Sequence, residues 1–282
     1  MPLTTITDET RLALTTLAER TIGFNVPSIR LGVTGLARAG KTVFISALVH
    51  NLIHGGRLPL FRSYSSGRVL GARLEPQPDD AVPRFEYERH VEALVEDRVW
   101  PDSTRQISEL RLTVAYESAS FLTRTIGGGR MHIDIVDYPG EWLLDLPLLS
   151  KDFATWSREA LAFARAPERG DTAAAWLGQL AAVDPKAPED EALARRLAGT
   201  FTDYLRKTRA ESGSLSTLPP GRFLMPGDLD GSPALTFSPL DLADDAIPPG
   251  STAAMMARRF ESYKSAVVRP FFRDHFARLD RQ

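Results

Sequence analysis

The chain has 282 residues, of which 43% are hydrophobic and 25% charged, so it is long enough for one large domain or two modest ones. A net charge of −2 excludes a strong general attraction to nucleic acid or anionic lipid, and the absence of cysteine excludes disulfides, thiolate catalysis and sulfur-ligated zinc. No apolar run reaches the roughly 18 residues of a membrane span and no signal peptide is visible, so we expect a cytoplasmic protein without a transmembrane segment.

The first predicted elements form a helix, a strand and a second helix. Residues 8 to 22 predict an amphipathic helix, and residues 28 to 34 a short strand that ends at Gly35. Residues 43 to 53 predict a mostly buried helix, closed by a pair of glycines. A strand, a glycine-containing turn and a helix in this order are the usual setting of a phosphate-binding loop.

The turn between that strand and helix, GLARAGKT, matches the phosphate-loop pattern G-x4-G-K-[S/T]. Glycines let successive backbone N–H groups surround phosphate oxygens, and the helix N-terminus attracts the anion. We expect Lys41 to reach the β- and γ-phosphates, Thr42 to coordinate Mg²⁺, and Arg38 to point outward, with neutralisation of phosphate charge as its alternative role. The predicted nucleotide-binding residues are Gly35, Leu36, Ala37, Arg38, Ala39, Gly40, Lys41, Thr42 and Val43.

The next elements in chain order are a loop over 58 to 80, a charged helix over 84 to 97, a strand over 109 to 116, a turn at 127 to 129 and a strand over 131 to 137. We therefore assign residues 1–147 to a nucleotide-binding core that carries an N-terminal helix and an insert at about 57–100.

The segment Asp137-Tyr-Pro-Gly-Glu141 directly follows the last of these strands. An Asp at the end of a strand can hold Mg²⁺ through water opposite a phosphate loop, and Gly140 can offer its backbone N–H to a γ-phosphate. This spacing resembles the GTPase branch of the phosphate-loop fold, in which the residue after the glycine often orients the attacking water. Here that residue is Glu141, whose negative charge would repel the γ-phosphate, so a solvated acid or a structural partner is the alternative.

The loop WPDST precedes the strand at 109. In Ras-like proteins a loop threonine at this place closes over Mg²⁺ and the γ-phosphate, and Thr104 fits that position best, with Ser103 in reserve. Hydroxyl groups that cap a turn are the alternative interpretation.

The remaining chain divides into a helical insert over 148–210, a Pro/Gly-rich irregular segment over 211–250, and a helix over 251–282 that returns to the core and bends at Pro270. No Asn/Thr-Lys-x-Asp motif, which normally selects guanine, follows a strand in this half. Only three convincing strands are predicted, so we expect either an unusually small sheet or a chain truncated at its C-terminal end. The base cannot be read from these residues.

Four segments together resemble the YcjX-like family of stress-associated phosphate-loop proteins: GLARAGKT, WPDST, DYPGEWLLDLPLL and the closing RPFFRDHFARLDRQ. The resemblance covers nearly the whole chain, and the last two segments are more specific than the phosphate loop. It implies a bacterial, cytosolic, GTPase-related protein with helical insertions, longer than this chain, in which an apolar strand and a guanine-binding Thr-Lys-Ala-Asp segment follow. It therefore implies GTP and GDP rather than ATP.

The expected fold is an α/β phosphate-loop nucleoside triphosphatase with an incomplete Ras-like sheet and helical insertions. The expected function is Mg²⁺-dependent GTP hydrolysis in a stress-related regulatory switch, with an unidentified protein partner and no nucleic-acid partner. Catalytic roles fall to Thr104, Gly140 and Glu141, and metal binding to Thr42, Thr104 and Asp137. A scaffold that binds nucleotide without hydrolysing it, and an ATP-dependent phosphate-loop enzyme, are the alternatives.

Overall fold

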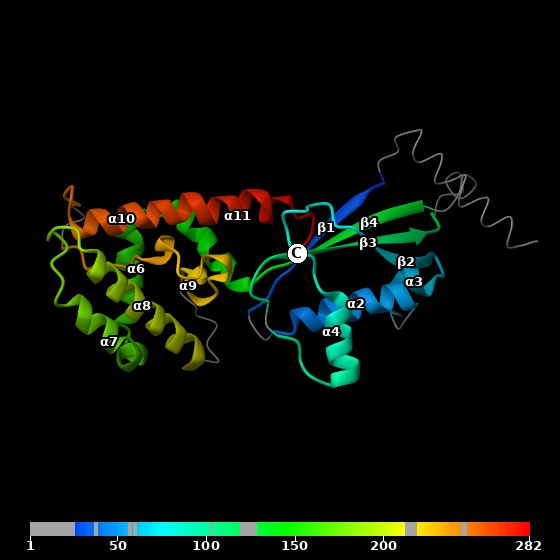
Figure 1. Ribbon diagram of the computed structural model, residues 1–282, viewed down its shortest axis with the longest axis horizontal. Helices are drawn as coiled ribbons and strands as arrows, with labels where there is room; N and C mark the ends of the chain where they lie inside the picture. Colours follow the sequence, from blue (N-terminus) through cyan, green and yellow to red (C-terminus); the bar gives the residue numbers. More distant parts are fainter. Residues whose placement is uncertain are drawn as a thin grey trace, which may run out of the picture.

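The computed structural model describes residues 26–36, 39–55, 58, 61–102, 104–118, 129–211, 219–243 and 247–282. Figure 1 shows two parts along the long axis of the molecule: a sheet lobe, made by residues 26–139, and a helical lobe, made by residues 151–268. The connecting segment η2 (Gly140–Ser150), a 3₁₀ helix, joins them along the chain. The expected helix at 8 to 22 lies outside the described residues, as do Ala37, Arg38 and Ser103.

Four strands form one mixed sheet in the described part of the chain: β1 (Ser28–Val33), β2 (Val69–Glu75), β3 (Ser108–Tyr116) and β4 (Gly129–Asp137). Their order is β1-β4-β3-β2, with β1 and β4 parallel and the other neighbours antiparallel. The three strands predicted from hydrophobic alternation are confirmed. The register pairs Val33 with Asp137, so the two parallel strands end side by side.

Strand β2 corrects the sequence expectation, which assigned residues 58 to 80 to a loop. Its sequence, VLGARLE, contains glycine and charged residues that favour strands only weakly, and a register shift between Val69 and Gly71 breaks its alternation. Pairing with the long strand β3 overrides this weak local preference. The same region also contains the short helix α3 (Arg62–Ser65).

Helix α2 (Lys41–His54) packs on the sheet through buried apolar side chains, among them Ile45 and Val49. These side chains form one core cluster with Leu110 of β3 and Ile135 of β4. Packing of this face fixes the start of α2 against the carboxyl end of β1, where the phosphate-loop sequence lies.

The charged helix expected over 84 to 97 begins later, as α4 (Tyr87–Glu92), and ends in the π-helical turn η1 (Ala93–Asp97). The start is delayed because the backbone N–H of Phe85 donates to the carbonyl of Glu109 in β3, which holds the preceding residues extended.

The helical lobe contains α6 (Phe153–Ala164), η3 (Pro167–Arg169), α7 (Gly170–Leu180), α8 (Glu191–Glu211), α9 (Gly221–Leu224), η4 (Gly227–Leu229), η5 (Pro233–Leu235), α10 (Thr252–Tyr263) and the π-helical turn η6 (Lys264–Val268). Its core is strongly aromatic: the ring of Trp156 stacks on Phe260 with centroids 4.8 Å apart, and Trp176 stacks on Tyr204 at 5.2 Å. None of the helices described is both long and apolar enough to cross a lipid bilayer.

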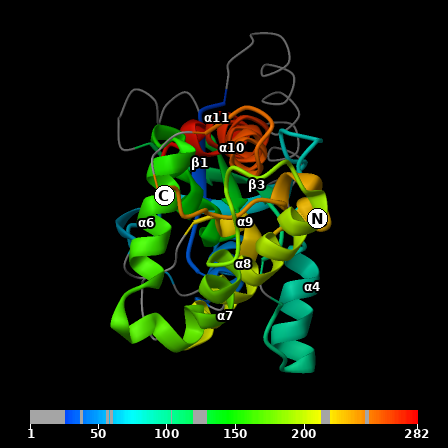
Figure 2. The same ribbon diagram turned by 90° about the vertical axis from the view of Figure 1, so that its left-hand side faces the viewer.

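The last helical run, α10, η6 and α11 (Arg269–Asp274), leads from the helical lobe back to the sheet, and Figure 2 views it nearly end-on. The 3₁₀ turn η7 (Phe276–Arg278) ends it. Beyond this turn, the backbone N–H of Asp280 donates to the carbonyl of Arg30 at 2.8 Å, and the N–H of Gly32 donates to the carbonyl of Arg281 at 2.9 Å. The chain thus returns to β1 on the edge opposite β4.

Candidate functional site

The loop between β1 and α2 presents the start of the helix to the site. Gly40 precedes α2 with a left-handed backbone (φ 87°) and, as a glycine, offers no side chain to cap the first helical turn. Helix N–H groups without an acceptor at the N-cap favour an anion in front of the helix. Lys41 and Thr42 are buried at this end.

A cavity of about 530 Å³ lies beside this loop. Its lining includes Ala39, Gly40, Lys41, Thr42 and Val43 from the loop and helix, and Trp100, Pro101, Asp102, Thr104 and Arg105 from the segment before β3. Leu36 is exposed and its carbonyl accepts a hydrogen bond from the N–H of Ala39 at 3.0 Å, which turns the loop.

Asp137, at the end of β4, is 2% exposed and accepts a 2.7 Å hydrogen bond from the hydroxyl of Thr104. Burial raises the pKa of this carboxyl, and the hydrogen bond and the positive charge of Lys41 oppose that rise. The structure therefore brings together three residues that lie far apart in the sequence.

These residues fit a Mg²⁺ ion bound together with phosphate. Thr42, Thr104 and Asp137 line one common cavity, and their oxygen donors are the type that Mg²⁺ prefers. The Oδ1 atom of Asp137 is buried and has no hydrogen-bond partner in the described part of the chain, so one carboxylate oxygen is left for a cation or a water on it.

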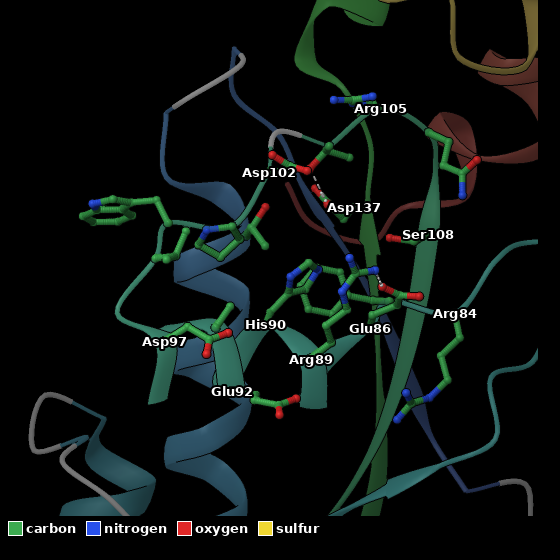
Figure 3. A pocket seen from close by; sticks show the side chains of 18 residues that line it. Arg84, Glu86, Arg89, His90, Glu92, Asp97, Asp102, Arg105, Ser108 and Asp137 are labelled. Carbon is green, nitrogen blue, oxygen red and sulfur yellow. Dashed lines mark hydrogen bonds and ion pairs between the residues drawn. The ribbon is translucent and has the colours of Figure 1, made fainter. Parts of the chain in front are cut away.

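That common cavity has a volume of about 1060 Å³ and extends from the phosphate loop towards α4. Figure 3 shows Asp102, Arg105 and Asp137 on one side of it, and Arg89 and His90 of α4 on the other. Burial lowers the pKa of His90, so its ring favours the neutral form. Arg84, which precedes α4, forms an ion pair with Glu88, and Arg89 of α4 forms one with Glu86.

Gly140 lies in backbone contact with the phosphate loop. A Cβ atom added at Gly140 would lie 2.5 Å from the carbonyl oxygen of Gly35 and 2.6 Å from its carbonyl carbon. Such distances exclude any side chain in this arrangement, so glycine is required by close approach of the two loops.

Glu141 is completely buried, and its Oε1 atom lies 2.8 Å from Nη2 of Arg209 in α8. This excludes the solvated acid that the sequence left open and gives the carboxylate a structural partner. Glu141 lines neither of the two cavities described above. A water-orienting role for it stays a prediction.

Sequence reasoning missed three residues near the site. Trp100 is 75% exposed although it lines both cavities, and Arg105 lines both without an ion pair among the described residues. An unpaired guanidinium beside a phosphate loop is a natural anion ligand, and its position next to Thr104 was the available signal. Arg209 carried no such signal, because nothing in the sequence places the end of α8 beside Glu141.

Comparison with known proteins gives a consistent result. A model of the YcjX-like family matches residues 29–282. A protein named Ras-like GTPase YcjX from Escherichia coli (strain K12) is 40% identical over 266 residues, which are 90% of this chain and 57% of that protein. One of the same name from Shewanella oneidensis is 35% identical over 274 residues, 90% of this chain and 56% of that protein. The chain spans about half the length of these curated relatives.

Proposed function

The chain belongs to the YcjX-like family, and on that premise we propose that it is a Ras-like phosphate-loop GTPase that acts as a cytoplasmic, stress-related switch. The observation that carries the proposal is that Thr42, Thr104 and Asp137 line one cavity at the ends of the parallel strands β1 and β4, and that Lys41 lines the second cavity together with Thr42 and Thr104. The printed name of the relatives supports guanine nucleotide and hydrolysis.

In this mechanism the chain binds the triphosphate chiefly through backbone N–H groups of residues 36 to 42 and the ammonium group of Lys41. Thr42, Thr104 and Asp137 would hold Mg²⁺, which when bound neutralises negative charge on the phosphates. The N–H of Gly140 contacts the γ-phosphate. When the γ-phosphate leaves after hydrolysis, the loop that follows β4 and the loop that precedes β3 lose this contact and are free to move. The helical lobe then presents the change to a protein partner.

A nucleotide-binding scaffold without hydrolysis is the second candidate. The observation in its favour is the ion pair between Glu141 and Arg209, which occupies the carboxylate that would otherwise orient water. Phosphate release measured under saturating GTP separates the two candidates, because a scaffold binds tightly without turnover.

The test of the site is the variant Lys41→Ala in the full-length protein. Loss of the ammonium group should abolish binding of GTP and GDP in calorimetry, because no other described lysine lines the cavities. Lys207→Ala, which removes an exposed lysine from α8, is the matched control and should bind as the wild type does. Undiminished affinity of Lys41→Ala would overturn the assignment. A parallel titration of the wild type with ATP shows whether the site prefers guanine or adenine nucleotides.

A further inference from the structure

Glu141 lies between the phosphate loop and the helical lobe. Its neighbour Gly140 is in backbone contact with Gly35 on one side. On the other side, a Cβ atom added at Gly221 of α9 would lie only 1.7 Å from the carbonyl oxygen of Glu141. Residue 141 is therefore held by the helical lobe within one residue of the predicted γ-phosphate contact.

The side chain of Glu141 has its own anchor in that lobe. Its carboxylate is 1% exposed and pairs at 2.8 Å with Arg209, whose side chain is 29% exposed. A buried carboxylate is costly unless it is paired, and a guanidinium offers two parallel donors to it. The partner comes from the last turn of α8, far along the chain.

The charge of the Glu141–Arg209 pair affects how the site binds a triphosphate. A carboxylate that follows Gly140 directly would repel the γ-phosphate in a partly desolvated site. The guanidinium of Arg209 offsets that negative charge at short range. The pair thus removes the electrostatic objection to a glutamate at this position.

We propose that Arg209 is a positioning residue for the triphosphate: it neutralises Glu141 and holds the Gly140–Glu141 backbone against the phosphate loop. The inference rests on the proposed GTP-binding function and extends it, because it makes the helical lobe contribute to the discrimination of GTP from GDP. A diphosphate lacks the γ-phosphate and does not sense Glu141 in this way.

Other contacts keep the connecting segment folded when Arg209 is changed. Asp145 accepts hydrogen bonds from the hydroxyl of Tyr263 and the N–H of Gly221, both at 2.6 Å, and the indole N–H of Trp142 donates to the carbonyl of Met225 at 3.0 Å. Loss of one ion pair is therefore a local change.

The experiment compares affinities for GDP and for a non-hydrolysable GTP analogue in the full-length protein. Arg209→Ala should lower the affinity for the analogue about tenfold or more and change the affinity for GDP less than about twofold. Arg209→Lys keeps the charge and should restore most of the loss. In the double variant Arg209→Ala/Glu141→Gln the carboxylate charge is gone, so the part of the lost analogue affinity that comes from repulsion should recover, while the part that comes from holding the backbone stays lost.

Arg206→Ala is the matched control, because Arg206 lies on the exposed side of the same helix and pairs with Asp203 at 3.6 Å. It should leave both affinities unchanged. An unchanged ratio of GTP-analogue to GDP affinity in Arg209→Ala, or no recovery in the double variant, overturns this inference alone. Absence of any nucleotide binding by the wild type overturns the proposed function as well.

Discussion

At the scale of single residues, two glycines, Gly35 and Gly140, decide how closely the loop after β1 and the loop after β4 approach each other. The pattern in the sequence assigns Gly140 to a backbone hydrogen bond with phosphate, which any residue except proline can donate. The structure adds a steric reason, because the carbonyl group of Gly35 occupies the space where a side chain at residue 140 would begin. The requirement for glycine here comes from the protein itself, before a ligand is considered.

Substitution Gly140→Ala should displace the loop after β4, because the added methyl group cannot coexist with the backbone of Gly35. We expect affinity for a GTP analogue to fall roughly tenfold or more, with GDP affected less, since a small misplacement suffices at a reacting phosphate. Calorimetric titration measures both. Gly199→Ala in α8 is the control, since its Cβ meets open space and alanine favours a helix. Equal losses for both nucleotides would contradict the expectation.

The sequence could predict those site residues that belong to motifs. Lys41, Thr42 and Asp137 follow from spacing and flanking strands, and Thr104 from its place before β3. In the structure Thr42, Thr104 and Asp137 line one cavity, and Lys41 lines the second cavity with Thr42 and Thr104. Arg209 could not be predicted, because a pairing between the end of a long helix and Glu141 depends on how the two lobes pack. Local sequence patterns carry no information on such a contact.

At the scale of elements, one buried carboxylate ties the connecting segment η2 to the helical lobe at two places. Asp145 accepts hydrogen bonds from α9 and α10, and therefore ties the segment after Gly140 to two elements of the helical lobe. Burial raises the pKa of Asp145 to about 6, although the hydrogen bonds from Tyr263 and Gly221 oppose the rise. The folded protein thus holds a proton on this group more tightly than the unfolded chain.

This predicts a pH dependence of stability with a defined sign. Asp145 contributes most to the free energy of unfolding below about pH 4, and this contribution is lost as the pH rises through about 6. Above that pH the buried, ionised carboxylate lowers the free energy of unfolding by about 3 kcal/mol relative to its value at low pH. Chemical unfolding of wild type and Asp145→Asn across this range measures it: the difference in the free energy of unfolding should change by that amount.

Asp152→Asn provides a control of opposite sign for this titration. Asp152 caps α6, and its hydrogen bond from the N–H of Thr155 lowers its pKa, so its contribution is lost as pH falls. If Asp145→Asn kept the wild-type pH dependence, the titration would belong to another group.

Among the elements, the sequence predicted those with strong periodicity and missed those that depend on partners. Strands β1, β3 and β4 alternate clearly, whereas β2 exists because β3 offers it an edge. The Pro/Gly-rich segment over 211–250 is predicted to be irregular. Its described residues contain the short helical turns α9, η4 and η5, and its Phe223 and Phe237 lie in the core of the helical lobe. Burial of irregular backbone follows from tertiary packing rather than from composition.

At the scale of the whole molecule, a small aromatic cluster joins the two lobes. It consists of Val136, Tyr138, Trp142 and Phe271, and is separate from the cores of the sheet lobe and the helical lobe. The rings of Tyr138 and Trp142 each lie 5.5 Å from that of Phe271, and the guanidinium of Arg222 covers the indole at 3.3 Å.

Trp142→Ala should therefore loosen the junction while the two cores persist. Truncation of a buried tryptophan costs about 3–5 kcal/mol, and hydrogen exchange should rise in η2 and α11 but not in α6 or α8. Trp156→Ala, in the core of the helical lobe, should produce the reverse pattern. Uniform loss of protection along the chain in both variants would show that the lobes unfold as one unit.

The return of the chain to β1 restricts how the lobes can move. The helical lobe is attached to the sheet through η2, next to β4, and again through Asp280 and Arg281 on the opposite edge of β1. Two attachments on either side of the strand that leads into the phosphate loop oppose rotation about a single hinge. Nucleotide-dependent motion is therefore expected as a small shear of α11 against the sheet, which keeps both attachments.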